Sequence, residues 1–207
     1  GPRGGRRQRE SACLAGLGIY GVDLHGGAWN NGDRTGCQAR DEVLAEAGFA
    51  VAALDFRQAE DGYPTSLIDI NYAIRWLKGS AKELGIDPAR VGISGQSSGG
   101  HLAMLTAMRP LDPRYTAIVL DIDAPSIDAT VKCVGMMWPV INPLSRYRHA
   151  LRSRASTSPE DWVGNIPESH DRYWITEENM AEGNPMLALE RKEPVIPPPA
   201  IWVQGRP

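Results

Sequence analysis

The chain has 207 residues, of which 42% are hydrophobic and 23% charged, the composition of a globular domain that can bury a core. The net charge of −3 at pH 7 argues against a nucleic-acid partner, because phosphate binding needs clustered Lys and Arg. The first ten residues contain four arginines and one glutamate. A small molecule is therefore the better candidate for a partner.

Cysteine usage and hydropathy favour a cytoplasmic protein without a membrane span. Cys13, Cys37 and Cys133 form an odd set without metal-ligand spacing, so we expect neither a zinc site nor a disulfide framework. The sequence contains no run of eighteen apolar residues and no secretory h-region. We predict no membrane partner, no metal and no cofactor. The Arg- and Gly-rich residues 1–16 are expected to be a disordered tail.

Strand-like and helix-like segments alternate along the first half of the chain. They are a strand at 19–24, a helical stripe at 43–47, a buried strand at 49–56, an amphipathic helix at 67–84 with Gly85 as its C-cap, a strand at 90–94 and a helix beginning near 101. This alternation is typical of a mostly parallel sheet with helices on both faces. The predicted fold class is therefore α/β, in one domain over residues 17–207.

The second half of the chain is less regular. Residues 111–128 are compatible with either a strand or a loop, whereas 131–138 indicates a buried strand that we prefer as a member of the sheet. From 142 to 193 the composition turns to Arg, Ser, Glu, Asn and Pro. We expect this stretch to be a cap-like insertion whose one clear helix, at 177–181, is capped by Thr176.

The pentapeptide GQSSG at 95–99 lies between a predicted strand and a predicted helix, the context of a nucleophile elbow. A serine at the tip of so tight a turn is strained, and flanking residues without a Cβ let strand and helix approach closely. Ser97 is therefore the candidate nucleophile.

A second motif, His-Gly-Gly at 25–27, follows directly after the first predicted strand. A glycine pair in this position leaves backbone N–H groups free to point at a developing oxyanion. Gly26 and Gly27 are thus candidate oxyanion donors. Trp29 follows them closely and is a candidate for contact with substrate.

With these two motifs the chain resembles α/β-hydrolases of the hormone-sensitive-lipase and acetyl-xylan-esterase-like group. The matching segments are HGGAW at 25–29 and GQSSGGH at 95–101, with further agreement at 53–57, 63–69 and 198–205. The resemblance implies Ser97 as nucleophile and the amides of Gly26, Gly27 and Ser98 as the oxyanion hole. It also implies that the domain is shortened at both ends.

In the group resembled, the acid and the histidine of the triad follow the late strand, which places them beyond Pro207. We therefore expect little activity from these 207 residues alone. The resemblance implies a serine hydrolase that cleaves short acyl esters or acetylated sugars. An amidase or formamidase on the same scaffold and a non-catalytic binding protein are the alternatives. The sequence identifies neither the substrate nor the oligomeric state.

Overall fold

The computed structural model describes residues 20–121 and 127–205, so the predicted tail at 1–16 lies outside the described residues. Five strands form one sheet in the order β2-β1-β3-β4-β5, and every neighbouring pair is parallel. The strands are β1 (Tyr20–Leu24), β2 (Ala50–Leu54), β3 (Val91–Gln96), β4 (Val134–Met137) and β5 (Ala200–Val203). The α/β class with a mostly parallel sheet is confirmed.

The strand order changes direction between β1 and β3. The chain first runs outward from β1 to β2, then crosses back to β3 and continues to β4 and β5. In the β1–β3 pair, Leu24 is in register with Gly95, so both strands end at the same level of the sheet. In open parallel sheets, ligands bind beyond the carboxyl ends of the strands at such a switch point. The loops that carry the two sequence motifs both leave the sheet there.

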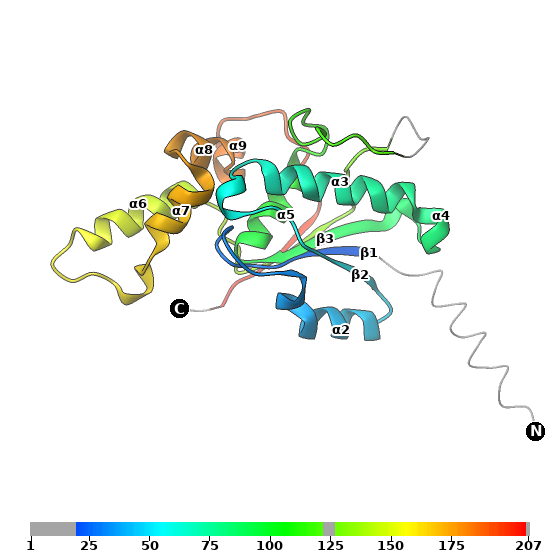
Figure 1. Cartoon of the computed structure of the whole chain (residues 1–207), viewed down its shortest axis with the longest axis horizontal. Coiled ribbons are helices and arrows are strands. Elements are labelled where there is room, and N and C mark those ends of the chain that lie inside the picture. Colours follow the sequence, from blue (N-terminus) through cyan, green and yellow to red (C-terminus); the bar gives the residue numbers. More distant parts are fainter. Residues whose placement is uncertain (1–19, 122–126, 206–207) are drawn as a thin grey trace, which may run out of the picture.

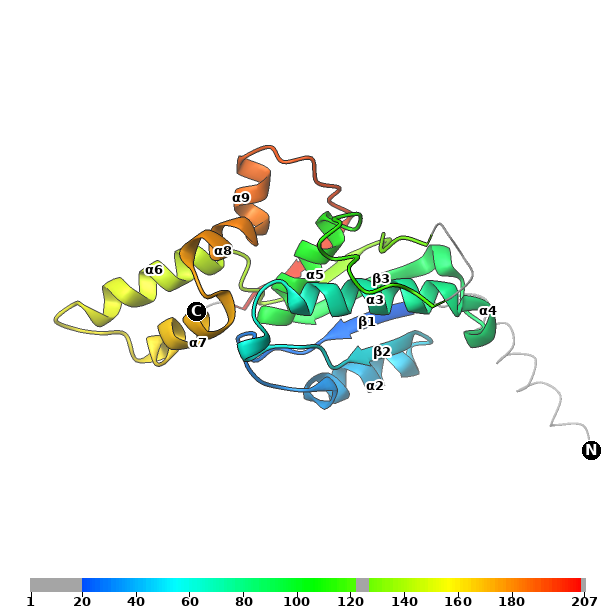
Figure 2. The same ribbon diagram turned by 45° about the horizontal axis from the view of Figure 1, so that its top comes forward.

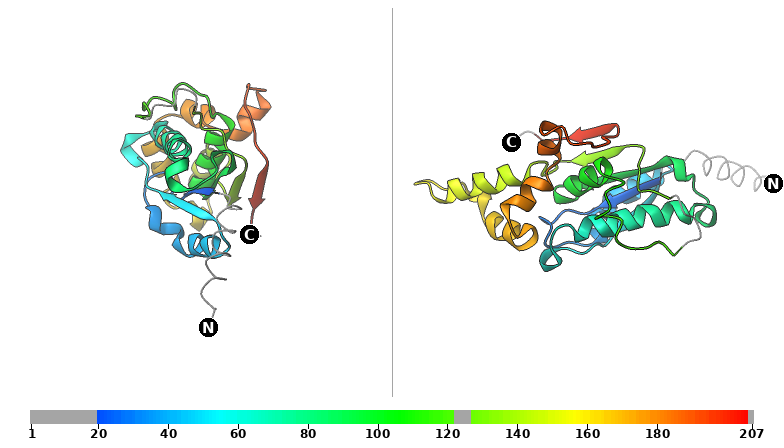
Figure 3. Two further views of the ribbon diagram at one scale, coloured as in Figure 1. Left: turned by 90° about the vertical axis from the view of Figure 1, so that its right-hand side faces the viewer. Right: turned by 90° about the horizontal axis from the view of Figure 1, so that it is seen from above.

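Helices cover both faces of the sheet, with α2 (Gln38–Glu46) on one face and α3 (Thr65–Gly79), α4 (Ala81–Leu84) and α5 (Ser98–Met108) on the other (Figures 1 and 3). All eleven residues of α5 are buried, which agrees with its nearly uniform apolar composition. By contrast, no residue of α2 is fully buried. The core therefore lies mainly between the sheet and the α3/α5 layer.

The helix predicted at 67–84 is two helices, because α3 ends at Gly79 and α4 begins at Ala81. Gly85 adopts the left-handed conformation (φ 67°) and caps α4 at its C-terminus, as predicted. The strand predicted at 49–56 is not buried. Ala50 is exposed and the rest of β2 is half-buried, because β2 is an edge strand of the described sheet.

Four helices follow β4 and lie beyond the carboxyl ends of the strands (Figures 1 and 2). They are α6 (Pro143–Arg154), α7 (Ile166–Trp174), α8 (Glu177–Glu182) and α9 (Pro185–Glu190). The expectation of one clear helix in this stretch was therefore wrong, although Thr176 does cap α8 by accepting from the amide of Asn179. We call residues 142–193 the cap segment.

Short 3-10 helices occupy Arg34–Cys37, Ala59–Asp61, Pro88–Arg90 and Asp161–Val163. For residues 111–128 the sequence left a strand and a loop open. Residues 111–121 form turns and loops, so the loop is correct there, and 122–126 lie outside the described residues. Among the residues described, no helix is both long and apolar enough to cross a membrane.

Candidate active site

Ser97 stands at the turn between β3 and α5 with φ 54° and ψ −119°, a strained backbone conformation for a residue with a Cβ. Three hydrogen bonds hold this turn in place. The Ser97 amide donates to the Met137 carbonyl (2.9 Å), and the Ser97 carbonyl accepts from the amides of His101 (3.2 Å) and Val140 (3.1 Å). The side chain is half-buried, and its hydroxyl has no hydrogen-bond partner among the described residues.

The glycines around Ser97 are required by close backbone contacts. A Cβ on Gly95 would lie 2.4 Å from the carbonyl carbon and oxygen of Gly99, and a Cβ on Gly99 would lie 2.3 Å from the carbonyl oxygen of His25. Real Cβ atoms do not approach backbone this closely. The strand, the helix and the His-Gly-Gly loop at 25–27, which we call the oxyanion loop, therefore reach their present spacing only with glycine. This explains both glycines of the GxSxG motif physically.

The His-Gly-Gly loop lies directly against the elbow. A Cβ on Gly26 would sit 3.3 Å from the Cβ of Ser97 and 3.4 Å from the carbonyl oxygen of Gln96. Gly27 has φ 118°, and its carbonyl accepts from the amides of Asn30 and Asn31, which closes a tight turn. Within the described residues, the amides of Gly26 and Gly27 make no hydrogen bond. Free donors and a free hydroxyl thus come together in one place.

The oxyanion loop is fixed by its neighbours on both sides. The His25 ring stacks on Phe56 at 4.4 Å between ring centroids. The Asn30 side-chain amide donates to the carbonyl of Ser169 in α7 (2.6 Å), and the Trp29 carbonyl accepts from the amide of Ala59 (2.8 Å). The cap segment therefore helps to hold the loop, a contact that the sequence alone did not reveal.

Trp29 is 1% exposed and lies beneath the loop. Its ring meets His101, His170, Tyr173 and Trp174 at centroid distances between 5.1 and 6.1 Å. Protein side chains cover the indole, so the structure gives it a packing role. Contact between Trp29 and substrate stays a prediction.

His101 is completely buried and connects three segments of the chain. Its Nδ1 accepts from the Trp29 indole N–H (3.3 Å), and its Nε2–H donates to the carbonyl of Gly183 in the cap segment (2.7 Å). Burial lowers the pKa of His101 to about 4, so the ring is neutral near pH 7 and keeps both bonds. It is a satisfied core histidine that links oxyanion loop, nucleophile helix and cap segment.

All four histidines lie in the described part of the chain, and none of their imidazole rings hydrogen-bonds to the Ser97 hydroxyl there. His25 contacts the carbonyl of its neighbour Gly26, His149 lies 2.6 Å from Glu160, and His170 donates to the carbonyl of Ile166. The placement of the triad base and acid beyond Pro207 stays a prediction.

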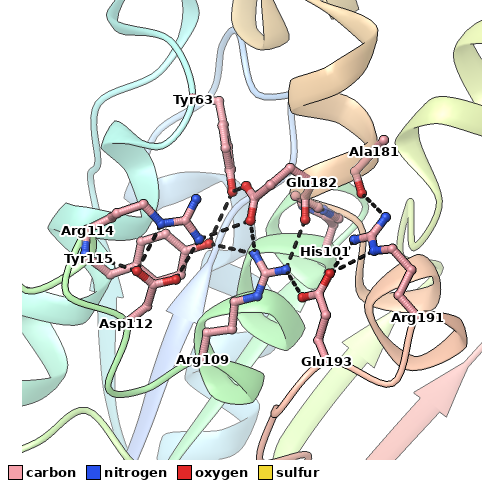
Figure 4. A network of polar contacts seen from close by, with 11 residues as sticks. Tyr63, His101, Arg109, Asp112, Arg114, Tyr115, Ala181, Glu182, Arg191 and Glu193 are labelled. Atoms are coloured by element: carbon pink, nitrogen blue, oxygen red, sulfur yellow. Dashed lines mark hydrogen bonds and ion pairs between the residues drawn. The ribbon is translucent and has the colours of Figure 1, made fainter.

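A buried arginine fastens the cap segment to the end of α5 (Figure 4). The guanidinium of Arg109 is 8% exposed and donates to Glu182 Oε1 and Glu193 Oε2, each at 2.6 Å, and to the Glu182 carbonyl at 3.0 Å. Glu182 also accepts from the Tyr63 hydroxyl. We call Arg109, Glu182, Glu193 and Tyr63 the cap clasp. No local pattern in the sequence predicts this cluster, because its members come from four separate segments.

A family model described as BD-FAE matches residues 21–178, which is most of the chain and includes both motifs. The chain belongs to the BD-FAE family. Comparison with solved structures agrees on the fold: esterase B from Lactobacillus rhamnosis (HN001) superposes with a TM-score of 0.68 at 24% identity, covering 88% of this chain and 54% of that one. The resemblance to an α/β-hydrolase is confirmed.

Two further relatives are somewhat more similar in sequence than esterase B is. The propionate-bound esterase Est2 from the Planctomycetes species Thermogutta terrifontis is 28% identical with a TM-score of 0.59, over 89% of this chain and 60% of that chain. The probable carboxylic ester hydrolase LipM of Mycobacterium tuberculosis (strain ATCC 25618 / H37Rv) is 29% identical over 175 residues, or 79% of this chain. This match covers 40% of the length of LipM.

Proposed function

We propose that this chain provides the nucleophile and the oxyanion hole of a serine esterase that cleaves small carboxylic esters through an acyl-enzyme. The observation that carries the proposal is the close approach of the two motif loops. A Cβ on Gly26 would lie 3.3 Å from the Cβ of Ser97. One carbonyl group can therefore meet both the serine hydroxyl and the free loop amides. The family membership and the esterase relatives support the same reaction class.

The reaction proceeds by acyl transfer. The Ser97 oxygen attacks the ester carbonyl, its proton passes to a general base, and the carbonyl electrons move onto oxygen. The amides of Gly26, Gly27 and Ser98 stabilise this oxyanion. Collapse of the intermediate breaks the bond to the alcohol, which leaves with a proton, and water then releases the acid from Ser97. None of the described residues supplies a base to the Ser97 hydroxyl, so activity is tested on the protein at its natural length, which we call the full chain.

The test is labelling of the full chain with a fluorophosphonate, followed by peptide mapping. Phosphonylation replaces fluoride at phosphorus with the oxygen of an activated serine. We expect one modified residue, Ser97, and no labelling of the Ser97→Ala protein. Modification of Ser94 or Ser98 in place of Ser97, or no labelling of a folded wild-type protein, would overturn the proposal.

We further propose that the partner is a small-molecule ester, and that the protein binds no nucleic acid, metal, cofactor or membrane. We propose a cytoplasmic location. The free thiols of Cys37 and Cys133 support a reducing compartment, because disulfides are common in oxidising ones. The third cysteine, Cys13, lies outside the described residues. Fractionation of cells that produce the tagged full chain tests the location.

A further inference from the structure

A pocket of about 500 Å³ opens between the loop after β4 and helix α6. Apolar residues 139–141 and the ring of Trp162 form part of its wall. The rest comes from one face of α6, where Arg146, His149 and Arg152 follow each other at a spacing of three residues. The pocket is therefore apolar on one side and basic on the other.

The two arginines of this pocket differ from the other arginines of the described chain. Neither Arg146 nor Arg152 makes a side-chain hydrogen bond or an ion pair with any residue of 20–121 or 127–205. All other described arginines have an interaction partner. Their positions are 34, 40, 57, 75, 90, 109, 114, 148, 154, 172 and 191. Both unpaired guanidinium groups thus line the same cavity.

Arg146 is the more informative of the two. Its guanidinium is partly withdrawn from water, and burial lowers its pKa. A cation in such a place is costly unless an anion compensates it. Glu160, an acidic residue beside this wall, is already paired with His149 Nε2 at 2.6 Å, and no described carboxylate forms an ion pair with Arg146. The pocket consequently has uncompensated positive charge and space for a ligand.

The pocket adjoins the candidate active site through its own wall. Val140, which lines the pocket, donates its amide to the carbonyl of Ser97 at 3.1 Å. A second connection runs through His170, which packs edge-on against Trp29. The pKa of His170 is lowered to about 4, mainly by burial and to a smaller extent by the positive charge of Arg146. Arg146 thus acts within electrostatic range of the residues that support the loop.

We propose that this pocket binds a carboxylate carried by the ester substrate, with Arg146 and Arg152 as its partners and the apolar wall against the connecting hydrocarbon. The inference rests on the proposed esterase function and adds the substrate class, an ester that also bears a free carboxylate. Guanidinium groups pair with carboxylates through two parallel N–H donors, which gives both affinity and orientation. The carboxylate belongs either to the acyl part or to the alcohol part.

Two substrate pairs test the class and separate these sources. On the acyl side, 4-nitrophenyl hydrogen glutarate is compared with 4-nitrophenyl 5-methylhexanoate, in which an isopropyl group replaces the carboxylate. On the alcohol side, 4-acetoxybenzoate is compared with the neutral 4-acetoxybenzamide. We expect kcat/KM for the charged member of one pair to exceed that of its neutral partner about tenfold, the effect of one charge-assisted interaction. The pair that shows the preference identifies the source.

Variants of the full chain connect this preference with the two arginines. Arg146→Met and Arg152→Met should each reduce the preference, and the double variant should abolish it while the neutral substrate is still cleaved. Arg154→Met is the matched control, because Arg154 lies on the same helix but is exposed and paired with Glu168. It should leave the preference unchanged. Equal rates within both pairs, or a preference that survives in the double variant, would overturn the inference and leave the esterase proposal intact.

A binding measurement keeps the inference testable without turnover. Calorimetric titration of the Ser97→Ala protein with 4-nitrophenyl hydrogen glutarate and with 4-acetoxybenzoate should give saturable binding of at least one of them. Adding Arg146→Met should raise its Kd about tenfold. If neither compound binds, the inference fails whatever the catalytic result. If both bind but Ser97 is not labelled by the fluorophosphonate, the esterase proposal fails and the carboxylate site stands.

Discussion

Gly99 is the residue at which the geometry of the elbow is least tolerant. Because a Cβ there would meet the backbone of His25 at 2.3 Å and Leu24 at 2.4 Å, the Gly99→Ala variant must push the oxyanion loop away from α5. We predict a loss of about 3 kcal/mol in the free energy of unfolding, measured by urea titration. Gly21→Ala is the control, since a Cβ at Gly21 meets nothing within 4 Å. Equal losses in both variants would contradict the packing argument.

The buried imidazole of His101 gives a prediction about pH. Burial lowers its pKa to about 4 in the native state, below the 6.5 of an unperturbed histidine. Between these values the unfolded chain binds a proton that the native state does not, so the free energy of unfolding falls as pH decreases from about 6.5 toward 4. Replacing the imidazole by the His101→Gln change should weaken this dependence by about 1 kcal/mol per pH unit. Unfolding curves at pH 7, 6 and 5 test this, and identical slopes for both proteins would refute it.

At this same scale, the sequence could place Ser97, Gly26 and Gly27 because each belongs to a short local motif. It could not place the partner of His101, because the Gly183 carbonyl is 82 residues away and any residue type supplies a carbonyl. It also could not show that the Trp29 indole is covered by aromatic side chains from α5 and α7. Contacts made across the fold leave no pattern in the local sequence.

At the scale of elements, the central strands and α5 were predictable because short apolar runs mark them, whereas α6 was not. Just three residues of α6 are buried, Pro143, Leu144 and Ala150, so its exposed Arg and Ser residues hide the apolar stripe. Its start was nevertheless encoded by Asn142 followed by proline, a combination typical of a helix N-terminus. The capping residues, and not the hydrophobic periodicity, are thus the sequence signal for this helix.

Asn142 provides a test of that start. Its side-chain oxygen accepts from the amide of Ser145 (2.9 Å) and from the side chain of Asn184 before α9 (2.7 Å). We predict that Asn142→Ala lowers the free energy of unfolding by about 1–2 kcal/mol, because an N-cap and a second hydrogen bond are lost together. Asn142→Asp keeps the acceptor and should recover most of this loss. Denaturant titration of both variants measures the difference, and equal destabilisation would rule out the capping role.

At the scale of the whole molecule, the cap segment and the sheet are joined by the cap clasp and by the bonds of Asn30 and His101. Removing the buried charge with Arg109→Met leaves Glu182 and Glu193 without their main partner. We predict a destabilisation of about 3 kcal/mol and faster amide hydrogen exchange in α8 and α9. Arg114→Met is the control, because the Arg114 side chain is 46% exposed and its ion pairs should contribute less than about 1 kcal/mol. Unchanged exchange in Arg109→Met would show that the clasp does not hold the cap segment.

The convergence of the two motif loops on one carbonyl can be measured directly in a crystal structure of the full chain with a phosphonate bound to Ser97 Oγ. We predict that one phosphonyl oxygen accepts hydrogen bonds from the amides of Gly26, Gly27 and Ser98 at roughly 2.7–3.1 Å. A phosphonyl oxygen that points away from the His-Gly-Gly loop, with the Gly26 and Gly27 amides unused, would contradict the proposed mechanism.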